Sequence, residues 1–127
     1  MHYKKLWTDL HSNIHHNQMG ELNQWIEHAK KTVDFWPVAY YPFYMKRTET
    51  GAGLEDLYDR EQIEQDWEQL RDAVKQQNEA GYPMFMGYEW QGSGEDGDHN
   101  VFFLDNDQPM LHPMRYEELY QAYKDRS

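Results

Sequence analysis

The chain has 127 residues and no cysteine, which excludes a disulfide scaffold, a thiolate zinc site and a cysteine nucleophile. Lysine and arginine number 12 against 23 aspartates and glutamates, and this net charge of −11 disfavours binding to a nucleic-acid phosphate backbone. Aromatic residues make up 16% of the chain, and no run approaches the roughly 18 apolar residues of a membrane span. These properties predict a folded cytoplasmic domain that binds neither nucleic acid nor membranes.

The first part of the chain alternates between strand-like and helical patterns. Residues 3–10 have the pattern of a strand. Apolar side chains at helical spacing then predict a helix near 21–33. Residues 34–41 are predicted as a short strand, in which Pro37 could not donate to a central ladder.

The next helix is the best-marked element of the chain. A loop is predicted from 42 to 57, and the helix from 60 to 80. Asp59 can cap this helix with Gln62 as its reciprocal partner. Gly81 can end it.

Two apolar runs and a third helical stripe complete the pattern. Residues 84–90 and 101–104 have the length and composition of strands that are buried on both faces. Residues from 114 onward again have helical spacing. The order β-α-β-α-β-β-α predicts an α/β fold with mostly parallel strands and flanking helices.

Three of the seven histidines lie where the first predicted strand ends. His11, His15 and His16 follow Asp9 in a polar segment. Strand ends are where α/β folds place their sites, and neutral imidazole is the commonest metal ligand. Asp9 could ligate a metal or orient an imidazole. The alternative is a solvated histidine-rich loop.

A second candidate site pairs Glu89 with His99. Glu89 stands inside an apolar run, and a buried carboxylate is costly unless it has a partner or a cation. If the strands 84–91 and 99–104 are antiparallel neighbours, the loop between them brings Glu89 and His99 to the same end. The alternative is that Glu89 points outward from an edge strand.

Other candidate residues are interpreted as structural. His28 and His112 are predicted to be surface residues. The aromatic residues of 40–44 could stack on a sugar ring, but core or subunit packing accounts for them as well.

In their order along the chain, these motifs resemble the PHP (polymerase and histidinol phosphatase) superfamily. The similarity is greatest to a poorly characterised PHP-like branch with the phrases G-Y-E-W and G-D-H-N-V-F-F-L-D. The matching segments are Thr8-Asp9-Leu10-His11, Val33-Asp34-Phe35, Gly87-Tyr88-Glu89-Trp90 and residues 97–105, which contain His99.

The resemblance implies a partial, distorted (β/α) barrel, with residues 1–127 as an N-terminal fragment that supplies about the first half. It also implies a cluster of divalent zinc, manganese or iron ions, and hydrolysis, most often of a phosphoester, by metal-activated water. His11 and His99 would be metal ligands and Glu89 a bridging ligand. Asp9 or His15 would complete the shell. We therefore expect His11, Glu89 and His99 to converge on one point.

The chain departs from the family pattern at two ligand motifs. Asn13 stands where the second histidine of H-x-H is expected, and Ala39-Tyr40-Tyr41 stands in place of T-D-H. Two further hypotheses therefore stand beside that of a metal-dependent hydrolase of a small, often phosphorylated substrate. One is an inactive fragment that binds a partner, a second copy of itself or the C-terminal part of the same protein. The other is a carbohydrate-binding module with aromatic platforms.

A half-barrel is also expected to form homo-oligomers. Open strand edges and uncovered apolar surface favour association, because both can be buried against another copy.

Overall fold

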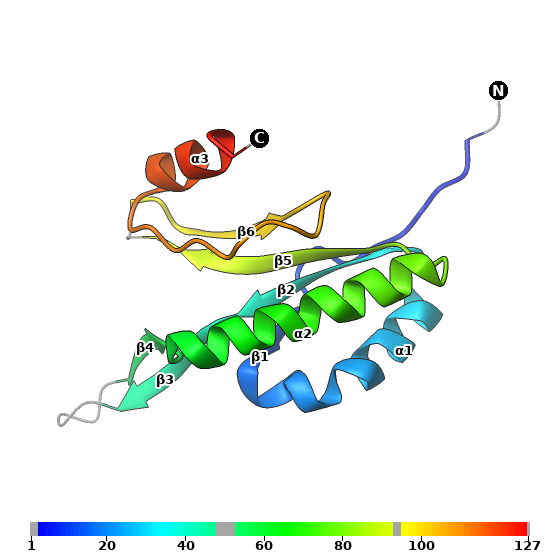
Figure 1. Cartoon of the computed structure of the whole chain (residues 1–127), viewed down its shortest axis with the longest axis horizontal. Helices are drawn as coiled ribbons and strands as arrows, with labels where there is room; N and C mark the ends of the chain where they lie inside the picture. The colour runs from blue at the N-terminus through cyan, green and yellow to red at the C-terminus, as the bar shows by residue number, and fades with distance from the viewer. Residues whose placement is uncertain (1–2, 48–52, 93–94, 127) are drawn as a thin grey trace.

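The computed structural model describes residues 3–47, 53–92 and 95–126, and its centre is a four-stranded sheet (Figure 1). The strands lie in the order β1 (Asn13–His15), β2 (Trp36–Tyr41), β5 (Met84–Gln91) and β6 (Asp98–Phe102). The first three are parallel, and β6 is antiparallel to β5. The α/β class with a mainly parallel sheet is therefore confirmed. The described strands form an open sheet rather than a closed barrel.

Two helices cover one face of this sheet. Helix α1 (Leu22–Thr32), which follows the short 3₁₀ helix η1 (His16–Glu21), connects β1 to β2, and α2 (Arg60–Glu79) lies between β2 and β5. Trp25 of α1 stacks on Trp36, and Asp66 of α2 bonds to Tyr40. Trp36 and Tyr40 point to the same face of β2, because alternate residues of a strand share a face. We call the side of the sheet that α1 and α2 cover the helix face, and the opposite side the open face.

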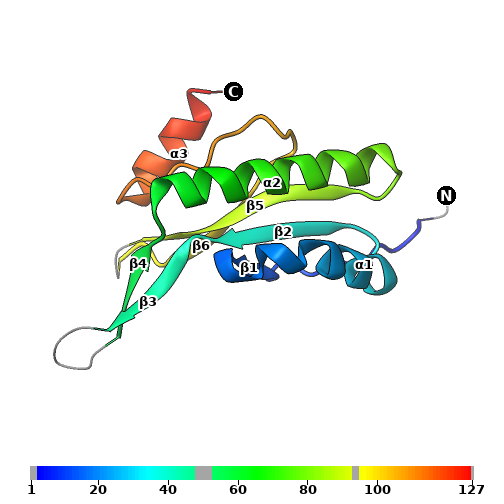
Figure 2. The same ribbon diagram turned by 60° about the horizontal axis from the view of Figure 1, so that its bottom comes forward.

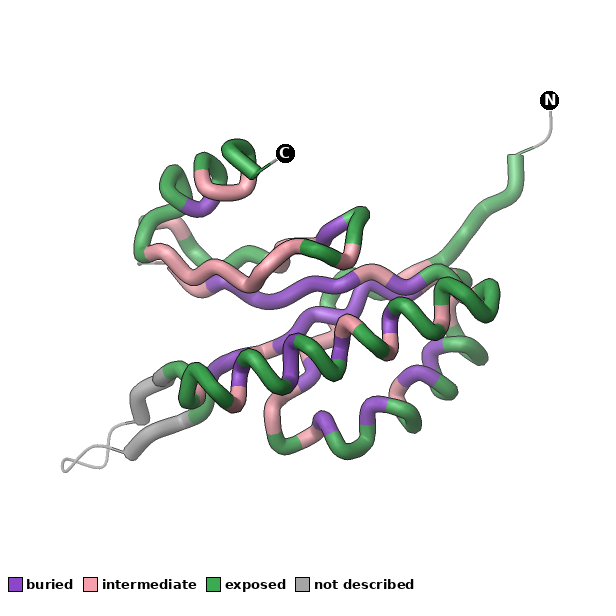
Figure 3. Tube along the Cα trace, in the orientation of Figure 1, coloured by how far each residue is buried: buried purple, intermediate pink, exposed green. Residues whose placement is uncertain are grey.

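The core lies between the helix face and the helices. Figure 3 shows burial along the central strands and on the sides of α1 and α2 that face them. The predicted stripes are confirmed, because the following side chains are all buried: Leu22, Ile26 and Ala29 of α1, and Ile63, Trp67, Leu70 and Val74 of α2. Each large side chain among them stabilises the fold by roughly 1.5–3 kcal/mol.

Of the two end signals that the sequence predicts for α2, the structure confirms only the one at the C-terminus. Asp59 is its N-cap residue, but the Asp59 side chain makes no capping bond, so the predicted capping box is wrong. Gly81 follows the helix with a φ of 96°, a conformation that glycine adopts without strain, and ends it as predicted. None of the helices in the described ranges is long and apolar enough to cross a membrane.

Pro37 lies inside β2 without disturbing the sheet. The backbone N–H of Trp36 donates toward β5, to the Pro83 carbonyl, and that of Ala39 donates in the other direction, to the Ser12 carbonyl. The nitrogen of Pro37 therefore faces the β1 side, because these directions alternate along a strand. Strand β1 pairs only with residues 39–41, so the N–H that proline lacks would have had no ladder partner.

The strand predicted at residues 3–10 is wrong, because the first strand begins at Asn13. Trp7 donates its backbone N–H to the Asp34 carboxylate over 2.8 Å, and the Thr8 hydroxyl donates to the Phe35 carbonyl over 2.6 Å. These bonds hold the segment beside the start of β2. Its apolar side chains do not form a buried face, since Leu6 is 57% and Trp7 70% exposed.

The loop predicted at 42–57 is also wrong. Strands β3 (Phe43–Arg47) and β4 (Gly53–Leu57) form an antiparallel pair that projects from one end of the sheet (Figure 2). The charged residues in both segments weaken the apolar signal of a strand. The predicted loop contains two glycines, of which Gly53 begins β4 and Gly51 lies outside the described residues.

The last helix, α3 (Tyr116–Lys124), lies near β6 (Figure 1). Two core tryptophans donate hydrogen bonds to the backbone of the segment between β6 and α3. The Trp67 indole N–H donates to the Gln108 carbonyl over 3.0 Å, and that of Trp90 donates to the Pro113 carbonyl over 2.8 Å.

Candidate functional site

Polar side chains gather on the open face where the parallel strands end. The register places the carboxyl ends of β1, β2 and β5 side by side. Glu89 stands opposite Asn100 of β6, so these two side chains are cross-strand neighbours. We call the group the strand-end cluster, and its members are Asn13, His15, Tyr41, Glu89, Gln91 and Asn100.

Glu89 is the centre of the strand-end cluster. Its side chain is buried, with 9% of the residue surface exposed. Asn13 donates from Nδ2 to Glu89 Oε1 over 3.2 Å, and Gln91 donates from Nε2 to Oε2 over 3.1 Å. Gln91 Nε2 also lies 2.8 Å from the Tyr41 hydroxyl. Outside residues 45–56, the ion pairs of lysine and arginine involve other carboxylates, and the hydrogen bonds that Glu89 accepts there come from two side-chain amides.

The position of β5 decides between the two interpretations of Glu89. The strand lies between β2 and β6, so Glu89 does not point outward from a sheet edge. A buried carboxylate needs hydrogen-bond donors, and the two amides supply them.

Two acceptor oxygens near Glu89 are left without donors. The side chains of Asn13 and Asn100 each use Nδ2, toward Glu89 and toward the Leu10 carbonyl. Their Oδ1 atoms are buried and have no hydrogen-bond partner in the described part of the chain. The Asn13 amide cannot be reversed, because its oxygen would then face the carboxylate. An orphaned buried acceptor costs about 1–3 kcal/mol, so a ligand with N–H groups would be stabilised here.

The expected convergence of His11, Glu89 and His99 is wrong. His99 of β6 stands opposite Trp90, whereas Asn100 stands opposite Glu89. Consecutive residues of a strand point to opposite faces, so His99 and Glu89 share an end of the sheet but not a face. The His99 ring nitrogen Nε2 instead lies 2.8 Å from the Asp96 carbonyl oxygen.

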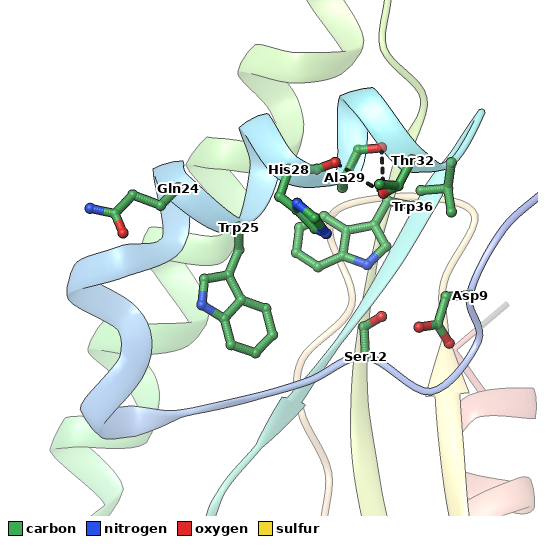
Figure 4. A pocket seen from close by; sticks show the side chains of 9 residues that line it. Asp9, Ser12, Gln24, Trp25, His28, Ala29, Thr32 and Trp36 are labelled. Carbon is green, nitrogen blue, oxygen red and sulfur yellow. Dashed lines mark hydrogen bonds between the residues drawn. The ribbon is translucent and has the colours of Figure 1, made fainter.

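The remaining predicted ligands do not complete a metal site. The backbone N–H of His11 donates to Asp9 over 2.8 Å, and Asp9 lines a separate pocket beside α1 (Figure 4). His15 does belong to the strand-end cluster, where its ring packs 4.4 Å from that of Tyr41. Within the described ranges, no three histidine, aspartate or glutamate side chains come together as a metal-binding group.

The residues around Glu89 do not fit the divalent metals that the resemblance implies. Asn13 and Tyr41, which replace histidines of the family pattern, do lie beside Glu89. However, zinc, manganese and iron sites use imidazole and carboxylate ligands, and the amide nitrogens of Asn13 and Gln91 have no lone pair to offer. These amides occupy both oxygens of the only carboxylate in the cluster.

Sequence reasoning missed a second buried network, on the helix face. His16 Nδ1 lies 2.6 Å from Asp66 Oδ2, and the Tyr40 hydroxyl donates to the same oxygen over 2.5 Å. Burial, together with the hydrogen bond to Asp66, raises the pKa of Tyr40 above its ordinary value, so the phenol keeps its proton. The sequence does contain an indication of this network. Asp66 falls between Ile63 and Leu70 on the apolar stripe of α2, and an acidic residue on such a stripe indicates a buried carboxylate.

Comparison with protein-family models, curated proteins and solved structures finds no match to the chain. The interpretation of the strand-end cluster therefore depends on its own chemistry.

Proposed function

We propose that the chain is a ligand-binding domain whose strand-end cluster binds a small organic cation, namely a primary ammonium or a guanidinium group. The buried Glu89 carboxylate carries this proposal, because side-chain amides donate to both of its oxygens and no lysine or arginine outside residues 45–56 pairs with it. A buried carboxylate is compensated better by a cation than by neutral donors alone.

The orphaned acceptors favour a cation that has N–H groups. Asn13 Oδ1 and Asn100 Oδ1 each need a donor, and they flank Glu89 from β1 and β6. Ammonium and guanidinium groups are donors without acceptors, so one such group can bond to a carboxylate and to amide oxygens together. The net charge of −11 would also raise the local concentration of cations.

This proposal develops the hypothesis of an inactive PHP-like fragment that binds a partner. The resemblance implies histidines at the positions of Asn13 and Tyr41. With an amide and a phenol there, the same strand ends would keep the buried Glu89 carboxylate but lose two of the imidazoles that hold metal.

A calorimetric titration with guanidinium and methylammonium tests the proposal. We expect saturable binding with a millimolar Kd, since ligands of so few atoms gain at most about 1.5 kcal/mol per heavy atom. Tetramethylammonium, which has no N–H group, should not bind. Glu89→Gln should weaken guanidinium binding at least about tenfold, because it removes the charge and keeps the shape. Glu61→Gln, at an exposed site of α2, is the control and should leave it unchanged.

A titration with zinc and manganese contrasts the proposal with the hydrolase hypothesis. One outcome would overturn cation binding in favour of a metal-dependent phosphoesterase: stoichiometric metal binding with hydrolysis of p-nitrophenyl phosphate, lost in Glu89→Gln and kept in Glu61→Gln. Equal binding of guanidinium to the native chain and to Glu89→Gln would also overturn it.

A further inference from the structure

A second pocket lies apart from the strand-end cluster, between α1 and the residues that precede β1 (Figure 4). Its volume is about 520 Å³, within the range of roughly 300–1,000 Å³ that is typical of small-molecule sites. One wall consists of α1 and the start of β2, and the other is the backbone segment that contains Asp9 and Ser12.

The first wall offers one exposed aromatic platform. The rings of Trp25 and Trp36 are stacked, with centroids 6.5 Å apart and an angle of 28° between their planes. Trp36 is 3% exposed and belongs to the core, whereas Trp25 is only half-buried. The small side chain of Ala29, one turn further along α1, leaves room beside the Trp25 ring. A ligand therefore meets the indole of Trp25.

The second wall holds hydrogen-bonding groups in fixed positions. The Ser12 carbonyl accepts the backbone N–H of Ala39, which anchors this segment to β2. Asp9 Oδ1 accepts the backbone N–H of His11 over 2.8 Å, which fixes the direction of the carboxylate. Figure 4 shows Asp9 and Ser12 on one side of the pocket, and Trp25 and His28 on the other.

We propose that this pocket binds a neutral sugar ring. The C–H face of a pyranose matches the flat Trp25 indole, and its hydroxyl groups both donate and accept hydrogen bonds. The polar groups provide both partners, because Asp9 is an acceptor, and the Ser12 hydroxyl and the His28 ring can each donate and accept.

Other small ligands fit the pocket less well. A methylated ammonium ion is recognised by several aromatic faces, but here Trp36 is buried and only Trp25 is accessible. An acidic or phosphorylated sugar would be repelled by Asp9 and by the net charge of −11. The proposal does not depend on the strand-end cluster, since the two sites share no residue.

Saturation-transfer NMR and tryptophan fluorescence test the proposal with glucose, galactose, mannose, N-acetylglucosamine and cellobiose. We expect saturable binding of at least one of them, with the strongest transfer to the C–H protons of one ring face. Trp25→Ala should weaken that binding at least about tenfold, and Trp25→Phe should weaken it less, because phenylalanine keeps a smaller platform. Asp9→Asn should weaken it about fivefold.

Two controls separate recognition from unfolding. Trp7→Ala removes an exposed tryptophan from the same N-terminal segment and should leave sugar binding unchanged. Glu89→Gln should also leave it unchanged, so this proposal and cation binding can fail separately. The sugar proposal is overturned if no sugar of the panel binds, or if cyclohexanol or tetramethylammonium binds as tightly as the best sugar. Equal sugar affinity of Trp25→Ala and Trp7→Ala would overturn it as well.

Discussion

Gly87, in the middle of β5, lies directly beneath the ring of Phe102. A Cβ atom at position 87 would lie 2.3 Å from Phe102 Cδ1 and 2.7 Å from the Val101 carbonyl oxygen. The backbone of the neighbouring strand cannot move away without disturbing the ladder between β5 and β6. The missing side chain thus lets Phe102 cover the open face beside Glu89.

Gly87→Ala should therefore destabilise the chain by about 1–3 kcal/mol, the usual cost of overpacking. Urea unfolding at equilibrium measures the change. Gly20→Ala is the matched control, since no atom lies within 4 Å of the added Cβ and the backbone needs no positive φ. It should be neutral, or stabilising by up to about 1 kcal/mol. Equal effects of the two substitutions would contradict this account of Gly87.

His112, predicted at the surface, is partly buried among aromatic side chains. Its ring centroid lies 5.2 Å from that of Phe43 and 6.3 Å from that of Trp90. Burial lowers the pKa of His112 below the ordinary value of 6.5. The unfolded chain therefore binds a proton here more readily than the folded chain does. Stability from this residue is complete above pH 6.5 and falls as the pH drops from there toward the lowered pKa.

Urea unfolding of the native chain and of His112→Gln, compared between about pH 7.5 and pH 5.5, tests this linkage. The native chain should lose more stability on acidification than the variant, by no more than about 1.4 kcal/mol per pH unit. His28→Gln, at an exposed site on α1, should keep the native pH dependence. If the His112→Gln curve stays parallel to the native one across this range, the buried ring does not cause the pH dependence.

The strand-end cluster shows what could be predicted about single residues. The burial of Glu89 was predictable, because an apolar run on both sides of a carboxylate indicates a costly environment. The face to which His99 points was not predictable. A shift of one residue in the pairing of β6 with β5 reverses this face, and the sequence of the loop before β6 does not determine that pairing. Asn13 and Tyr41 suggested only lost ligands. Their role as surroundings of Glu89 follows from strand pairing, which a single sequence does not contain.

At the scale of elements, Asp66 connects three of them. From α2 it accepts hydrogen bonds from Tyr40 of β2 and from His16 at the start of η1. Nearby, Gln69 of α2 donates to the Met19 carbonyl of η1 over 3.0 Å. These contacts fix the helix over the carboxyl ends of the strands.

Asp66→Ala should cost about 1–3 kcal/mol, because it leaves the buried Tyr40 phenol and the partly buried His16 imidazole without their acceptor. Asp72→Ala, at an exposed site of the same helix, should change the free energy of unfolding by less than about 0.5 kcal/mol. Thermal or urea unfolding measures both variants. A cost for Asp66→Ala as small as that for Asp72→Ala would show that the network does not stabilise the fold.

The elements differ in how readily the sequence predicts them. α1 and α2 were predictable, since their apolar stripes coincide with the faces that they bury. The β3–β4 pair was not, because its segments mix charged and apolar residues without a clear alternation. The opposite error occurs at residues 3–10, where the apolar side chains suggested a strand although Leu6 and Leu10 are exposed.

At the scale of the whole molecule, the direction of chain winding explains why one face stays open. The path from β1 through α1 to β2, and through α2 to β5, advances across the sheet in one direction. Crossover connections are almost always right-handed, so two crossovers in the same direction put both helices on one face. The strand-end cluster lies on the opposite face, at the strand ends where α/β folds usually bind ligands.

This arrangement also predicts self-association. The sheet has two edges, β1 and β6, and large apolar side chains are exposed near its margins, among them Trp7 at 70%, Leu104 at 94% and Tyr120 at 58%. Open edges and apolar patches are buried favourably against a second copy.

Sedimentation velocity at micromolar concentration should therefore show a dimer or a larger species. Leu104→Ser should shift the distribution toward the monomer without lowering stability against urea. Glu61→Gln, which changes an exposed polar site, should leave the distribution unchanged. A compact 15.4 kDa monomer at every concentration would contradict this prediction and show that the open face and both edges are stable in water.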